Sequence, residues 1–139
     1  MLPNDKDRRA PALARHEVQA DPRMLRQVLR EVERDLNGVA GSTRRIVLLL
    51  VGALADQWSR QSPRREQSMI LDIEHLPDRV RVEAFTNETL PADFWTTVGP
   101  EVATGLADRW GIERRHRSGG AWFEIDTEAT DKPPSPRTS

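Results

Sequence analysis

The three histidines are the side chains best suited to bind a metal or to act as an acid or base, and their positions favour neither role. His16, His75 and His116 lie far apart in the chain, each beside charged residues. None has a metal-ligand spacing with another histidine or with an acid. We therefore interpret them as surface histidines and predict no metal site. The absence of cysteine excludes disulfides and thiolate ligands.

Phosphate-binding and nucleophile motifs are also missing from the sequence. The chain contains no Gly-x-x-x-x-Gly-Lys loop, no Gly-x-Gly-x-x-Gly loop and no evident Ser/His/Asp arrangement. Ser118-Gly119-Gly120 is typical of a turn. Gly99-Pro100-Glu101 precedes a predicted helix, but the proline lacks an N–H and the glutamate repels phosphate. The residues alone thus predict a globular domain without an identifiable catalytic site.

Length and composition favour one cytoplasmic domain. The 139 residues are 37% hydrophobic and 31% charged, with a net charge of -1, which argues against a direct nucleic-acid or membrane partner. The N-terminus has no signal-like apolar segment, and the apolar run 47–51 is too short to cross a bilayer. We expect a disordered lead-in over 1–12, a folded domain over 13–126 and a disordered proline-rich tail over 127–139.

The longest apolar run, IVLLLVGALADQW at 46–58, predicts a buried central helix. Its six leading apolar residues would also suit a buried strand, but the run continues to Trp58 without a turn signal. Ser42 or Thr43 is the expected N-cap. Gly52 costs this helix about 1 kcal/mol relative to alanine, which suggests close packing or a bend there.

A second helix is predicted to begin at Asp21-Pro22 and to end at Asn37-Gly38. Its apolar residues recur at helical spacing and form one stripe. Its opposite face has mixed charge and includes Arg26 and Arg30.

The remaining segments predict strands and one more helix. Alternation of apolar and polar residues indicates an edge strand over 13–20 and hairpins over 68–85 and 112–125. Between the hairpins, 86–99 is predicted to be an irregular loop in which Phe94 and Trp95 are either exposed, as in a binding lid, or inserted into the core. A helix should begin at Pro100 and end at Trp110. The order β-α-α-β-β-α-β-β predicts an α+β two-layer sandwich, with three helices on one face of a mostly antiparallel sheet of about five strands.

Three strings add a family resemblance to this pattern. They are EVQADPRMLRQVLREV, IVLLLVGALADQW and GLADRWGIERRHRSGGAWFEID. Together with the element order, they resemble the histidine-kinase-like ATP-binding domain in the small form used by bacterial anti-sigma-factor serine kinases, especially actinobacterial ones. The resemblance covers about 13–126 and implies ATP with magnesium, a sigma factor and an anti-anti-sigma (STAS-type) protein as partners, and often a homodimer.

The family's nucleotide residues are altered at the matching positions. The resemblance places its catalytic glutamate at Ala53 and its magnesium-binding asparagine at Gln57. The adenine-binding aspartate falls at Thr86, or at Asn87 in a register shifted by one. Of the Gly-x-Gly phosphate loop, only Gly99 is near the expected place.

The altered positions favour a non-catalytic, anti-sigma-type interaction module without a cofactor. Its candidate contact residues are Phe94, Trp95, Arg26 and Arg30. One alternative is an active ATP-dependent serine/threonine kinase that uses Gln57 and Asn87 with ATP and magnesium. In a second alternative, the chain shares only its architecture with this family and has an unrelated function.

Overall fold

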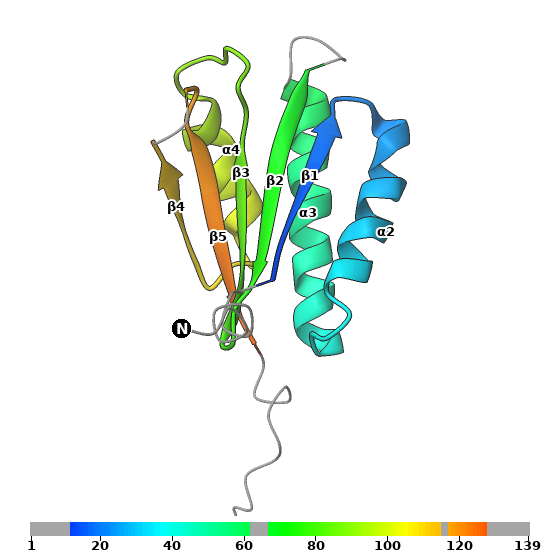
Figure 1. Cartoon of the computed structure of the whole chain (residues 1–139). Coiled ribbons are helices and arrows are strands. Elements are labelled where there is room, and N and C mark those ends of the chain that lie inside the picture. The colour runs from blue at the N-terminus through cyan, green and yellow to red at the C-terminus, as the bar shows by residue number, and fades with distance from the viewer. Residues whose placement is uncertain (1–11, 62–66, 115–116, 128–139) are drawn as a thin grey trace, which may run out of the picture.

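The protein folds into a five-stranded antiparallel sheet with three helices on one face (Figure 1). The structure is a computed structural model that describes residues 12–61, 67–114 and 117–127. The strand order is β1-β2-β3-β5-β4. In chain order the elements are β1 (Ala12–Gln19), the 3₁₀ turn η1 (Pro22–Met24), α2 (Leu25–Asp35), α3 (Gly41–Gln61), β2 (Ser68–His75), β3 (Arg79–Phe85), α4 (Phe94–Ala103), β4 (Arg109–Glu113) and β5 (Gly120–Asp126). The predicted fold class and element order are confirmed.

The sheet buries one face and leaves the other polar, as its alternating strands require. Leu71, Val82 and Phe123 are fully buried and represent the inner face. On the outer face Asp72 lies opposite Glu83, and Arg15 of β1 forms two hydrogen bonds to Asp72, of 2.7 and 2.8 Å. The arginine offsets the repulsion of two facing carboxylates.

The central helix α3 is confirmed, and the structure buries one of its faces strongly while leaving Leu49 exposed on another. Val47, Leu50, Leu54 and Trp58 are almost wholly buried, whereas Leu49 is 56% exposed. The helix begins at Gly41, so Ser42 and Thr43 lie inside its first turn and neither is the N-cap. A Cβ at Gly52 would meet no atom within 4 Å, so the predicted close packing there is wrong.

The helix after β1 begins where the sequence predicts. The Asp21 side chain accepts a hydrogen bond from the backbone N–H of Arg23, and Pro22 occupies the first turn. The helix ends at Asp35, two residues before Asn37-Gly38. Gly38 does not adopt a positive φ, so the predicted left-handed helix end is absent.

The last helix lies upstream of its predicted position. α4 spans Phe94–Ala103 with Pro100 inside it, and the segment expected to close the helix at Trp110 belongs to β4. Burial of Phe94, Trp95, Val98 and Val102 at helical spacing accounts for the shift, because this face packs on the core. Pro100 has no backbone N–H and so costs the helix one hydrogen bond. Its exposed position makes this loss easier to tolerate.

The second hairpin is confirmed, but its first strand, β4, begins at Arg109 rather than at residue 112 as predicted. Gly119 has φ +76°, which suits a glycine turn. A Cβ at Gly111 of β4 would lie 2.7 Å from the ring of Trp122, so this glycine lets the indole lie against the β4 backbone. Arg81 covers the same ring at 4.8 Å from its centroid.

The predicted lead-in and tail fall outside the described residues, except at their inner ends. β1 begins at Ala12, and the backbone N–H of Thr127 donates to Asp78 at 3.0 Å. Over the described ranges, no helix has the length and apolarity needed to cross a membrane.

Candidate functional site

The residues to which the resemblance assigned nucleotide binding have separate local roles. Gln57 accepts a hydrogen bond from Gln61 at 3.3 Å. The buried Thr86 hydroxyl donates to Ser68 at 2.7 Å and accepts from the Glu88 backbone at 3.0 Å. Asn87 is exposed on the loop that follows.

Gly99 is part of α4 rather than of a loop before a helix. A Cβ on it would lie 2.8 Å from the Trp110 ring, so this glycine allows the close contact of α4 with β4. In the described part of the chain, no hydrogen bond joins any two of Gln57, Thr86, Asn87 and Gly99. Ala53 is half-buried on α3 and offers only a methyl group.

Aromatic side chains fill the contact between the end of α3 and the start of α4. Trp58 and Phe94 meet edge to face with ring centroids 5.6 Å apart, and Phe94 and Trp95 meet similarly at 4.9 Å. Phe94 and Trp95 are only 6% and 4% exposed. The interpretation of these two as core residues is confirmed, and their use as an exposed contact surface is wrong.

His16 connects the sheet to α2. Its Nε2 lies 2.6 Å from Asp35 and its Nδ1 3.3 Å from Glu31, and its side chain is only 9% exposed. The prediction of a surface histidine is therefore wrong for His16, whereas His116 lies outside the described residues. No cluster of three potential ligands suited to a metal ion occurs among the residues described.

Three arginines form a row on the outer face of α2. Arg26, Arg30 and Arg34 are exposed and spaced four residues apart, so they share one side of the helix. None of them has an ion-pair partner among the described residues. They line a surface groove of about 750 Å³, whose walls include the half-buried Leu25 and Leu29. We call this surface the α2 groove.

The outer face of the sheet carries a second charged cluster, centred on Glu124. Arg109, Arg81 and Arg79 approach this carboxylate at 2.9, 3.1 and 3.3 Å. Burial opposes ionisation of Glu124, but hydrogen bonds from Arg109 and Arg81 and the charge of Arg79 outweigh it and lower its pKa. Hydrogen bonds from Arg109 likewise lower the pKa of Asp126. These arginines are neutralised, so they are poorer candidates for an anionic partner than the α2 groove.

Replacing Glu124 by glutamine is expected to destabilise the protein by about 1–2 kcal/mol at pH 7, because three arginines lose a shared carboxylate. A carboxylate with a lowered pKa stabilises the fold above its ordinary pKa, and this contribution disappears as the pH falls through the folded-state pKa. Urea unfolding of both proteins should show a difference that is largest at neutral pH and shrinks below about pH 4. A pH-independent difference would contradict the charge argument.

Sequence reasoning found Arg26 and Arg30 but missed Arg34 and the groove. The four-residue spacing could have added Arg34, since Arg34 continues the same row. The groove could not be predicted from the sequence, because helical spacing does not show how far neighbouring elements cover Leu25 and Leu29.

Comparisons with known proteins show similarity of fold only. No protein-family model matches the chain, and no curated protein matches it in sequence. Among solved structures, it resembles the crystal structure of the RsbU and RsbW domains of Rv1364c from Mycobacterium tuberculosis, with a TM-score of 0.56 and 12% sequence identity. The match covers 82% of this chain and 31% of that one, so this chain spans about a third of the solved chain. The predicted two-layer α+β fold is consistent with this neighbour.

Proposed function

We propose that this protein is an anti-sigma-type regulator that acts by binding another protein, without ATP-dependent phosphorylation. The row of unpaired arginines on α2 carries the proposal, because it offers positive charge beside half-buried leucines. The structural neighbour that contains an RsbW domain supports a regulatory role of this kind. The expected partner is a sigma factor or an anti-anti-sigma (STAS-type) protein, in the cytoplasm.

The packing of α3 against α4 supports the absence of nucleotide chemistry. Trp58 and Phe94 occupy the contact between these helices, and no carboxylate stands at Ala53 to position a water or remove a proton. Thr86 uses its hydroxyl to hold the loop after β3. At two of the family's nucleotide positions, Thr86 and Gly99 thus have structural roles.

The α2 groove suits an acidic segment of the partner. Arg26, Arg30 and Arg34 provide three positive charges along roughly one helix face, and Glu31 is already engaged by His16. Charges of this kind at an interface act mainly on the association rate and on specificity. The leucine walls supply apolar contact beside them.

Charge reversal on this groove tests the proposed partner surface. Arg30→Glu is expected to weaken binding of the cognate sigma factor or STAS-type protein about tenfold or more, mostly through slower association. The measurement is surface plasmon resonance against each purified candidate at two salt concentrations. Arg45→Glu, at an exposed arginine on α3, is the matched control and should bind like the unchanged chain. Equal loss in both variants would contradict a specific role of α2.

Calorimetric titration with Mg-ATP separates this proposal from the kinase alternative. We expect no binding at submillimolar concentrations. Submillimolar binding that is lost in Gln57→Ala, but kept in the neighbouring Gln61→Ala, would instead establish a working nucleotide site. Binding kept in both variants would also contradict the absence of ATP use, and would place the nucleotide away from Gln57.

A further inference from the structure

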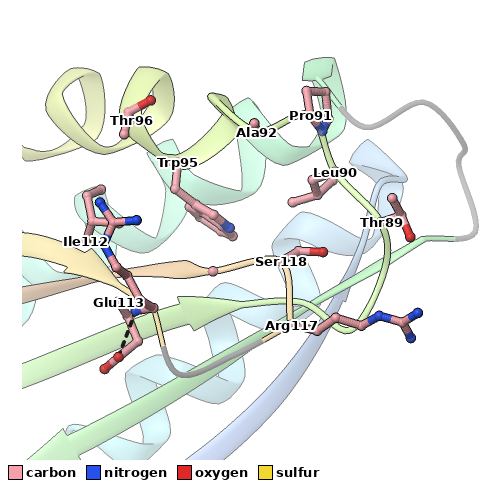
Figure 2. A pocket seen from close by; sticks show the side chains of 12 residues that line it. Thr89, Leu90, Pro91, Ala92, Trp95, Thr96, Ile112, Glu113, Arg117 and Ser118 are labelled. Atoms are coloured by element: carbon pink, nitrogen blue, oxygen red, sulfur yellow. Dashed lines mark hydrogen bonds between the residues drawn. The ribbon is translucent and has the colours of Figure 1, made fainter.

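A cavity lies between the start of α4 and the turn of the second hairpin, apart from the α2 groove (Figure 2). Its volume is about 550 Å³, within the range of about 300–1,000 Å³ that is usual for small-molecule sites. Its walls come from the loop before α4, from α4 itself, from β4 and from the turn that leads into β5. None of Gln57, Thr86, Asn87 and Gly99 lines it.

The cavity is bordered by a buried hydrogen-bond donor that the protein leaves unpaired. Trp95 is 4% exposed, and its indole Nε1 has no acceptor among the described residues. Figure 2 shows this nitrogen on the edge of the ring that faces Leu90 and Ser118. By contrast, the indole N–H of Trp58 donates to the Gln67 carbonyl at 3.1 Å. A buried indole N–H usually has a partner, and leaving one unpaired costs about 1–3 kcal/mol.

The remaining lining combines apolar, hydroxyl-bearing and exposed charged side chains. Leu90, Pro91 and Ile112 supply apolar surface around the indole ring. Arg114 and Arg117 lie at the rim, and neither has an ion-pair partner among the described residues. Glu113 is the opposing charge.

Two hydrogen bonds form at the cavity walls, and one of them joins separate segments. The Ser118 hydroxyl donates to the backbone carbonyl of Glu88, which ties the loop after β3 to the hairpin turn. The backbone N–H of Arg114 donates to the Glu113 carboxylate at 2.9 Å. With two arginines and one glutamate, the charged lining has an excess of positive charge.

From these features we propose that the cavity binds a small organic carboxylate with an apolar body. The apolar part lies against Leu90, Pro91 and Ile112, the carboxylate lies toward Arg114 and Arg117, and one acceptor oxygen takes the Trp95 N–H. A hydrogen bond to a charged carboxylate is stronger than one between neutral groups. This ligand site is independent of the partner surface on α2, so either can fail without the other.

Titration of the ¹⁵N-labelled protein with phenylacetate, followed through the indole N–H signals of the four tryptophans, tests the proposal. The Trp95 signal, assigned with Trp95→Phe, is expected to move downfield and to saturate with a dissociation constant below about 1 mM. The Trp58 signal should stay in place because its N–H is already bonded. Phenethyl alcohol, which has a similar body without the charge, should bind at least tenfold more weakly.

Substitution at the rim keeps the test independent of the folding of Trp95→Phe. Arg117→Ala should weaken phenylacetate binding about tenfold, whereas Arg45→Ala on α3 should not. The proposal is overturned if the Trp95 signal does not respond, if all four signals drift without saturation, or if the alcohol binds as well as the acid. A response to inorganic phosphate alone would equally exclude a site for an apolar carboxylate.

Discussion

Replacing Trp58 by alanine is expected to lower the free energy of unfolding by about 3–5 kcal/mol, one of the two largest single-residue effects that we predict. Trp58 is 1% exposed and packs edge to face on Phe94, where α3 meets α4. Alanine would leave a cavity there and remove the hydrogen bond to Gln67. The Gln67 carbonyl would keep one partner, the backbone N–H of Ala20 at 3.2 Å, so the cavity dominates the loss.

Urea unfolding followed by circular dichroism measures this effect. Leu49→Ala, on the same helix but at a side chain that is 56% exposed, is the control and should change stability by less than about 0.5 kcal/mol. Trp58→Phe should fall between the two variants because it keeps a ring against Phe94. Similar midpoints for Trp58→Ala and Leu49→Ala would show that the contact between α3 and α4 does not depend on this indole.

Replacing Gly120 by alanine is expected to destabilise the fold by about 2–3 kcal/mol, although it adds only one methyl group. The added Cβ would lie 2.5 Å from the backbone oxygen of Ala84 and 3.0 Å from the Cβ of Phe85. The main clash is with backbone, which a side-chain rotation cannot relieve. β3 and β5 pair through this region, so the strands would have to separate locally.

Gly52→Ala is the matched control for this substitution. The site is in a helix, and no atom lies within 4 Å of the added methyl group. This variant is expected to be more stable by about 1 kcal/mol, because alanine has the higher helix propensity. Thermal unfolding should therefore move in opposite directions for the two glycines, and equal destabilisation would contradict the packing argument at Gly120.

Local sequence is sufficient to predict the helical state of 46–58, the start of the preceding helix at Asp21-Pro22 and the first hairpin. Each has a local cause that operates without tertiary contacts. Asp21 caps amides two residues away, and strict alternation in 68–85 specifies which face of each strand is buried. These local signals, combined in order, were enough for the two-layer α+β fold.

The start of the last helix depends on tertiary contacts. Pro100 is locally a good first residue of a helix, and Thr96, Thr97 and Gly99 read as loop residues. The burial of Phe94 against Trp58, and of Trp95 against Phe94, stabilises the helix before that proline, and a long-range gain of this kind outweighs propensity. Trp110 matched the helical spacing by coincidence and instead packs on Gly99 from β4.

The candidate sites divide in the same way. Exposed arginines at four-residue spacing can be read from the chain, since a helix places them on one side whatever it packs against. The sequence does not predict the unpaired N–H of Trp95 or the cavity beside it. Their lining residues meet only when the second hairpin closes against α4; they include Leu90, Trp95, Ile112 and Ser118. Local sequence determined which helices and strands form, and packing between distant segments decided which side chains line a site.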